Sequence, residues 1–210
     1  MDESTRKRRD LWIRKILVVG LFIGLSILFT ITFYINGRLG IDSDGSFHFS
    51  RVEEIYRNLK EGSFFTFIAT HTFHNSGVGS FLFYPSVFIY PWATLRFIFD
   101  PLRAFYVWYG LVMFLTMAIA YYVMFKFSQR RIRAIIFAIF YAISAYHLYL
   151  GLKNYVIGEF IAYTFVPLVM YGFYEVVFGD AKKWPLLSMG VALLLYSHLL
   201  STVMAVAIMA

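Results

Sequence analysis

The stretch from Asp42 to Arg51 holds the side chains of this chain that are best suited to chemistry. Asp42 and Asp44 form a DxD pair. Such a pair can hold a divalent cation, Mg²⁺ or Mn²⁺, and either carboxylate alone can act as a general base toward an acceptor hydroxyl. The alternative is local structure, because Asp-Ser-Asp-Gly is ordinary turn sequence, and Asp44 and Ser46 both suit the start of a helix. Both interpretations stay open at this point.

His48 and Arg51 follow the acidic pair at helical spacing. If a helix begins near Ser46, these two side chains lie three residues apart on one face, with Asp44 just ahead of the first turn. A guanidinium can bind a phosphate through two parallel hydrogen bonds, and an imidazole can donate to it or transfer a proton. A salt bridge from Asp44 or Glu54 to Arg51 is the structural alternative.

Glu159 and His198 are two further ionisable residues that lie within apolar segments. A charged group inside a membrane helix costs roughly 2.5 to 3.5 kcal/mol on insertion scales, so such residues usually face a cavity or a polar partner. We expect Glu159 at the outer mouth of one helix and His198 about two-thirds of the way outward along the next. Hydrogen bonds between helices are the alternative, since Ser197 and Ser201 flank His198.

The composition indicates a membrane protein. The chain is 60% hydrophobic, 21% aromatic and 15% charged, whereas ordinary soluble domains have a charged fraction of about 25%. Several apolar runs reach the roughly 20 residues that a helix needs to cross a bilayer, without the alternation of a membrane barrel. We therefore expect an all-α polytopic membrane protein. The absence of cysteine excludes disulfides and thiolate metal sites.

The basic residues favour a membrane topology over nucleic-acid binding. The net charge of +7 lies mainly beside the apolar segments, where the positive-inside rule and contact with anionic membrane lipid explain it, so no nucleic acid is expected. The apolar segments cover 16–35, 81–99, 104–127, 134–150, 158–178 and 185–207. If 81–99 crossed the membrane, the basic residues at 126–133 and 182–183 would lie outside. We therefore expect five crossings, with a cytoplasmic N-terminus at 1–15.

Residues 36–103 form the expected extracytoplasmic loop, and 104–210 the expected helix bundle. Within the loop, 46–61 is amphipathic, and 83–99 combines prolines with interfacial aromatic residues, so both are expected to form surface-lying helices. The first should end at Gly62. His71 and His74 lie in a stretch that favours a loop over a shared metal site. The run at 203–210 has no polar exit, so we expect the protein to continue beyond it.

Five short motifs occur in an order that resembles the bacterial YfhO-like and pyruvoyl-tetrahydropterin-synthase-related membrane proteins. They are Asp44-x-x-Phe47-His48-x-x-Arg51, Leu59-x-x-Gly62, Phe83-Tyr84-Pro85, Gly158-Glu159 with Pro167, and Ser197-His198-Leu199. These groups are similar to GT-C glycosyltransferases, which have an aspartate in the first outer loop and surface-lying helices after it. The resemblance implies a GT-C-like transmembrane helix bundle.

The resemblance also implies an activity. Such enzymes take a sugar from a polyprenyl-phosphate carrier at the outer face of the cell membrane and pass it to a glycan or lipid acceptor of the cell envelope. Asp44, with Asp42 as its rival, would be the catalytic base, and His48 and Arg51 would contact the donor phosphate.

Three more residues would contribute to the substrate site. Glu159 and His198 would approach it from later helices, and Lys153 stands where the pattern leads us to expect an arginine for phosphate binding. Two other functions stay open from the residues alone. One is a transporter or flippase for a lipid or glycan, and the other is a non-enzymatic assembly factor of the envelope.

Overall fold

The computed structural model describes residues 3–36 and 44–210, and these residues are mainly helical. The α-helices are α1 (Glu3–Asn36), α2 (Gly45–Lys60), α3 (Ser80–Phe83), α4 (Tyr90–Leu95), α5 (Pro101–Ser128), α6 (Arg131–Ala142), α7 (Ala145–Leu152), α8 (Ile157–Phe178), α9 (Trp184–Leu195) and α10 (Leu199–Met209). Three short 3-10 turns are η1 (Phe73–Asn75), η2 (Val87–Ile89) and η3 (Ala181–Lys183). The described residues form no β-strand, only an isolated bridge between Ala69 and Val78. The all-α expectation is confirmed.

Three helices are long and apolar enough to cross a membrane. They are α1, over Arg8–Ile31, together with α5 and α8. A fourth candidate is the pair of α6 and α7, which is bent by 42° at the break between the two helices. Large apolar side chains are exposed along α1, among them Ile16, Leu17 and Leu28, as expected for a surface that faces lipid.

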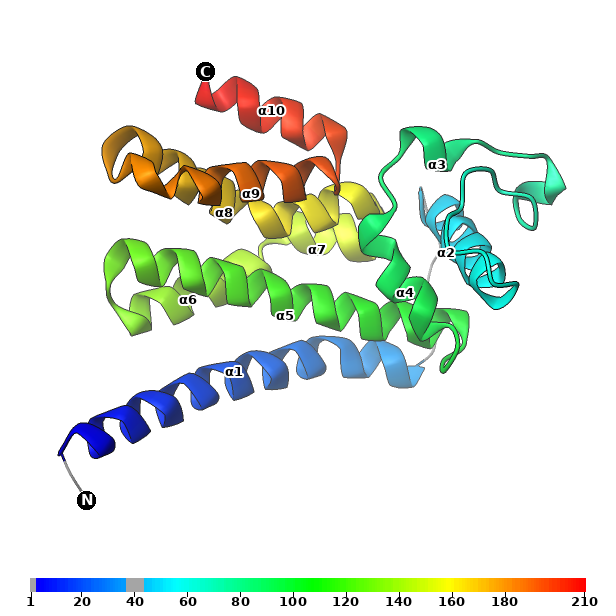
Figure 1. The fold of residues 1–210 in the computed structure, drawn as a ribbon. Helices are drawn as coiled ribbons and strands as arrows, with labels where there is room; N and C mark the ends of the chain where they lie inside the picture. Colours follow the sequence, from blue (N-terminus) through cyan, green and yellow to red (C-terminus); the bar gives the residue numbers. More distant parts are fainter. Residues whose placement is uncertain (1–2, 37–43) are drawn as a thin grey trace.

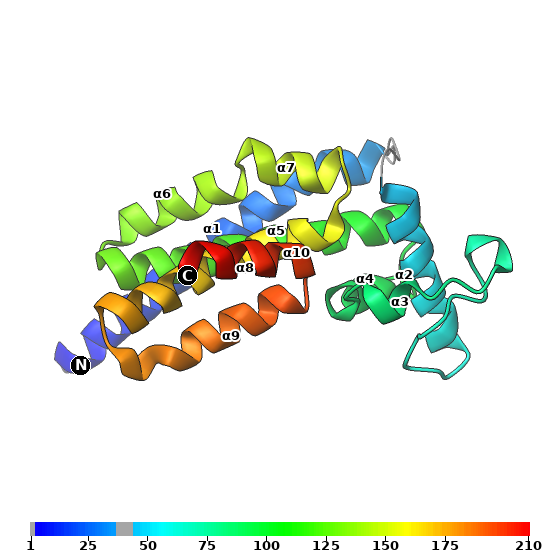
Figure 2. The same ribbon diagram turned by 90° about the horizontal axis from the view of Figure 1, so that it is seen from above.

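The long helices lie side by side, with α5 and α8 running in the direction opposite to α1, so the bundle has two distinct ends (Figures 1 and 2). One end carries the start of α1, the turn between α5 and α6, and the turn between α8 and α9; we call it the basic end. The other carries the starts of α5 and α8 beside the short helices α2, α3 and α4; we call it the α2 end. The basic stretches 126–133 and 182–183 thus lie at the same end as the start of α1. This arrangement agrees with the topology in which residues 81–99 do not cross the membrane.

α2 agrees closely with the helix expected at 46–61, and its end explains the role of Gly62. Gly62 has a φ of +86°, in the left-handed region that favours glycine. Its N–H donates to the Leu59 carbonyl at 3.1 Å, and the N–H of Ser63 donates to the Asn58 carbonyl at 2.8 Å. This pair of bonds is a Schellman motif, which satisfies the last carbonyls of the helix.

The orientation of α2 differs from the expectation of a helix lying on the membrane surface. Its polar residues His48, Arg51 and Glu54 are at most 1% exposed, and they point into the protein. A buried polar stripe requires polar partners, and here backbone groups of the following loop supply many of them. Hydrophobicity alone could not reveal that this face is the inner one.

Two segments expected as continuous helices are divided. Residues 83–99 form the end of α3, the turn η2 and the short α4, because Pro85 and Pro91 interrupt regular hydrogen bonding. Residues 134–150 form α6 and α7, and the hydroxyl of Ser144 accepts the N–H of His147 to start α7.

The prediction of one continuous helix at 185–207 is also wrong. It consists of α9 and α10, which are separated by a turn and packed against each other and against α8. His198 is the N-cap of α10, and its ring accepts the N–H of Ser201. The break therefore puts His198 at the start of α10, and this start lies at the α2 end of the bundle (Figure 1).

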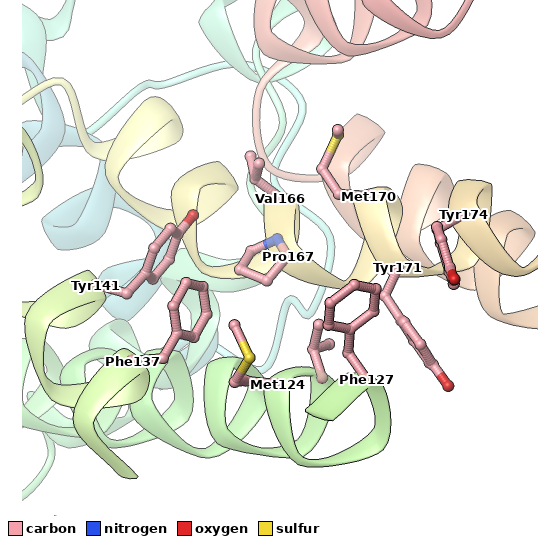
Figure 3. A pocket seen from close by; sticks show the side chains of 10 residues that line it. Met124, Phe127, Phe137, Tyr141, Val166, Pro167, Met170, Tyr171 and Tyr174 are labelled. Atoms are coloured by element: carbon pink, nitrogen blue, oxygen red, sulfur yellow. The ribbon is translucent and has the colours of Figure 1, made fainter. Parts of the chain in front are cut away.

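Pro167 lies inside α8 without breaking it. A proline cannot donate to the carbonyl four residues earlier, which here belongs to Tyr163. The hydroxyl of Tyr141, from α6, donates to that carbonyl at 2.8 Å and so replaces the missing bond. Figure 3 shows Tyr141 and Pro167 facing the same pocket between α5, α6 and α8.

An aromatic cluster fixes the α2 end onto the bundle. Trp92 of α4 stacks on Trp108 of α5 with ring centres 5.0 Å apart, and Phe49 of α2 meets Trp92 edge-on at 4.9 Å. Phe105 lies 5.0 Å from Trp92 in the same cluster. Pairs of this kind add about 0.5 to 1.5 kcal/mol each beyond the burial of their area. These ring contacts therefore hold α2 in place against α5.

Candidate functional site

Arg51 joins α2 to the segment before α4. Its Nη2 donates to the carbonyl oxygens of Tyr84, at 2.9 Å, and Pro85, at 3.0 Å. The guanidinium carbon lies 4.7 Å from the ring centre of Tyr84, and the rings of Phe47 and Phe81 lie at 5.6 and 5.2 Å. Burial lowers the pKa of Arg51 to about 10, which leaves it charged at neutral pH. Two carbonyls and three aromatic faces thus stabilise this cation.

The salt bridge to Arg51 from Asp44 or Glu54 is absent from the described residues. Glu54 is fully buried and accepts the N–H groups of Thr70 at 2.7 Å, His71 at 3.0 Å and Thr72 at 2.9 Å. Glu54 therefore holds the loop onto α2. Sequence reasoning missed this role; the available signal was a carboxylate three residues after Arg51, on the same helix face.

His48 packs beside Arg51, as their spacing predicted. It is 1% exposed, with its ring edge-on to Phe47 at 5.1 Å and to Tyr84 at 5.4 Å, and neither ring nitrogen has a hydrogen-bond partner among the described residues. Burial, with the charges of Arg51 and His198 acting in the same direction, lowers the pKa of His48 to about 3. His48 is therefore neutral at physiological pH.

A small cavity of about 10 Å³ lies between α2, the Tyr84–Pro85 segment, the start of α8 and the end of α9. His48 and Arg51 line it, and the Nε and Nη1 atoms of Arg51 are without partners among the described groups. A space of roughly this size holds one water molecule, and its lining offers several polar partners.

Gly158 is the point where three segments meet. A Cβ at this position would lie 2.7 Å from the hydroxyl of Tyr84, 3.0 Å from the carbonyl oxygen of Ser197 and 3.1 Å from the ring of His198. The Gly158 backbone also hydrogen-bonds the phenol of Tyr84. The missing side chain therefore lets α8 approach both the Tyr84 segment and the turn before α10.

Asp44 lies at the N-cap position of α2 and is exposed. Its backbone carbonyl accepts the N–H of His48 at 3.0 Å, but its carboxylate makes no capping hydrogen bond. It lies close enough to Tyr84 to raise the pKa of the phenol, although burial is the larger cause. The capping alternative for this carboxylate is therefore not realised. Asp42 lies outside the described residues.

Glu159 and His198 approach Tyr84 from α8 and from the turn before α10. Glu159 accepts a short hydrogen bond from the hydroxyl of Tyr146, and Nδ1 of His198 lies 2.8 Å from the hydroxyl of Ser201. Burial lowers the pKa of His198, and the nearby charge of Glu159 opposes that shift. Both residues thus have local partners, as the hydrogen-bonding alternative expected, and both also belong to the group around Tyr84.

The remaining predicted residues lie outside this group. Lys153 is exposed at the C-cap of α7. His71 pairs with Glu61 at 3.3 Å, whereas His74 is exposed, so the two histidines do not share a metal site. No three His, Asp or Glu side chains within 3–36 and 44–210 are grouped so that they could hold a metal ion. Asp42, one of the two carboxylates of the DxD pair, lies outside these residues, so the possible divalent cation at that pair stays a prediction.

Four motifs of the expected order meet around one side chain, Tyr84, although they lie up to about 150 residues apart in the sequence. The contributing residues are Asp44, His48, Arg51, Pro85, Gly158, Glu159, Ser197 and His198. We call this group the Tyr84 cluster. The fifth motif, Leu59-x-x-Gly62, ends α2.

No family model, no curated protein and no solved structure matches this chain.

Proposed function

We propose that this chain belongs to an integral membrane glycosyltransferase of GT-C type, which transfers a sugar from a polyprenyl-phosphate carrier to a cell-envelope glycan or lipid. The observation that carries the proposal is the Tyr84 cluster, in which buried polar groups gather at one end of an apolar bundle, beside the start of α2, where the Asp44 carboxylate is exposed. A lipid-linked donor requires this combination, because its chain needs an apolar surface and its reacting end needs polar groups.

Asp44 acts as the base in this proposal. Its carboxylate accepts the proton of the acceptor hydroxyl while the hydroxyl oxygen attacks the anomeric carbon of the donor sugar. The bond between that carbon and the phosphate oxygen breaks, and the polyprenyl phosphate leaves with the electron pair. Positioning and electrostatic stabilisation of the leaving phosphate supply most of the rate enhancement.

The buried residues have a positioning role. Arg51 and His48 are too deeply buried to contact a donor directly, so they are assigned to holding the Tyr84 segment and the N-terminus of α2 in place. Glu159 and His198 are the half-buried members of the cluster. Lys153, exposed at the C-cap of α7, is assigned to the donor phosphate, although a lysine lacks the planar fork of arginine.

The transporter alternative has less support. A proton-coupled path needs carboxylates that can exchange partners along the bundle. Glu159 already accepts a bond from Tyr146, and Glu175 pairs with Lys183 at 2.9 Å near the basic end. Each carboxylate has a local structural partner, whereas Asp44 has no hydrogen-bond or ion-pair partner for its side chain among the described residues.

The test is donor turnover in proteoliposomes containing the complete protein, measured as polyprenyl phosphate released from a panel of polyprenyl-phosphate sugars. A positioned general base contributes about 10² to 10⁴ in rate, so Asp44→Asn should lower turnover by about 100-fold or more. The fold should persist, because the Asp44 side chain makes no capping bond.

Asp180→Asn is the matched control, since Asp180 is exposed at the basic end, and it should change turnover by less than about twofold. If Asp44→Asn retained full turnover of a donor that the unmodified protein uses, Asp44 would not be the base. If no donor were turned over by the unmodified protein, the transferase proposal itself would fail.

A further inference from the structure

A groove of about 390 Å³ runs between α1 and α5 near the basic end. Its walls are apolar and aromatic: Phe22 of α1 meets Tyr121 of α5 edge-on at 5.8 Å, and Tyr121 stacks on Phe125 at 5.9 Å. It lies on a part of the bundle formed by two of the three helices that are long enough to cross a membrane. In a bilayer that these two helices cross, the groove would face the hydrocarbon.

Four cations surround one end of this groove. They are Arg14 and Lys15 from α1, Lys126 from the last turn of α5 and Arg131 from the first turn of α6. None of them has an ion-pair partner among the residues that the structure describes. The nearest acidic residue on α1, Asp10, pairs with Arg9 instead. The groove thus combines unneutralised positive charge with an apolar channel.

The neighbouring pocket in Figure 3 provides a contrast. It lies between α5, α6 and α8 at a similar depth and is lined by aromatic, aliphatic and Met side chains, without a lysine or arginine. An apolar pocket of that kind has nothing to recognise a charged headgroup. The cationic end is therefore a particular property of the groove between α1 and α5.

We propose that this groove binds one anionic phospholipid, with its phosphate at the four cations and an acyl chain along Phe22, Tyr121 and Phe125. Charge complementarity supports this occupant, because basic pockets between membrane helices on the cytoplasmic side bind anionic headgroups. The positive-inside rule places the basic end at the cytoplasmic leaflet, where anionic lipids are plentiful. The site is separate from the Tyr84 cluster and does not depend on the proposed transferase activity.

The test uses the full chain in an uncharged detergent, titrated with phosphatidylglycerol or phosphatidylcholine and analysed by native mass spectrometry. Phosphatidylglycerol should bind at least tenfold more tightly than phosphatidylcholine. Arg14→Gln/Arg131→Gln should weaken phosphatidylglycerol binding by tenfold or more. The matched control, Arg130→Gln/Arg133→Gln, removes the same charge from exposed residues outside the groove and should change binding by less than twofold.

A further variant tests the apolar part. Ala118→Trp fills the groove beside Phe22, and it should reduce the binding of both lipids while leaving the four cations in place. Equal losses in the two double variants would show general surface attraction and would overturn the proposal, as would equal affinity for the two lipids. If Arg14→Gln/Arg131→Gln does not fold, Lys126→Gln and Arg130→Gln provide the same comparison as single changes.

Discussion

Arg51 is a buried cation whose partners are backbone carbonyls and aromatic rings. Removing a charge from water costs several kcal/mol, and this cost is offset only when the geometry of the new contacts is good. The helical spacing of His48 and Arg51 correctly predicted that they lie together. It could not predict that they point inward. The hydrogen-bond partners of Arg51 lie 33 or more residues away, at Tyr84 and Pro85, and the residue pattern of one helix does not reveal such distant partners.

Replacement of Arg51 by lysine should destabilise the protein. Lysine keeps the charge but cannot reproduce the planar fork that contacts both carbonyls and lies against the Tyr84 ring. We expect a loss of about 2 kcal/mol or more, since hydrogen bonds from charged groups contribute about 1.5 to 3 kcal/mol. Arg57→Lys, on the exposed side of the same helix, should cost less than about 1 kcal/mol. Denaturant unfolding in detergent measures both, and equal losses would contradict the assigned role of Arg51.

His48 should make the stability of the protein sensitive to acid. Its pKa is about 3 in the folded protein and 6.5 ordinarily, so the unfolded chain takes up the proton first as the pH falls. The contribution of the neutral, buried His48 to the free energy of unfolding is therefore complete above pH 6.5 and is lost progressively as the pH falls toward 3. The unfolding temperature of His48→Phe should fall less than that of the unmodified protein between pH 7 and pH 4.5. If the unfolding temperatures of the two proteins fell in parallel with pH, the assigned role of His48 would be contradicted. A steric effect of phenylalanine would shift the unfolding temperature equally at every pH and leave its pH dependence unchanged.

At the scale of elements, the amphipathic pattern of residues 46–61 and the glycine at position 62 predicted α2 well, because helix capping and the spacing of apolar residues are local properties of the sequence. The division of 185–207 into α9 and α10 was not predictable from hydropathy. Apolar residues predominate on both sides of the break, and the break depends on His198 and Ser201 starting a new helix. The Tyr84 cluster exists because of that break, which brings Ser197 and His198 to the start of α8.

Gly158→Ala should disturb this junction. The new methyl group would lie 3.0 Å from a backbone carbonyl of the turn before α10, and overpacking of this kind costs about 1 to 3 kcal/mol. Gly24→Ala in α1 is the control, since a Cβ there has no neighbour within 4 Å; alanine should even stabilise that helix by about 0.5 to 1 kcal/mol. Thermal unfolding of the two variants compares them directly. Similar unfolding temperatures would mean that the close contact at Gly158 is not important.

At the scale of the whole molecule, the bundle separates two kinds of chemistry. The Tyr84 cluster lies at the α2 end, whereas the unpaired cations of the groove between α1 and α5 lie at the basic end. The charge distribution in the sequence predicted this separation, because the basic stretches follow the positive-inside rule only if 81–99 does not cross. Both proposals depend on the α2 end facing outward.

The orientation of the two ends is therefore the most direct test of this account. The chain contains no cysteine, so single cysteines can be introduced without background at the exposed positions Ser46, Val87 and Lys182. In right-side-out membrane vesicles, a membrane-impermeant maleimide should label Ser46→Cys and Val87→Cys at once, and Lys182→Cys only after the membrane is permeabilised. Labelling of Lys182→Cys in intact vesicles, or protection of Ser46→Cys, would contradict the assignment of the Tyr84 cluster to the outer face.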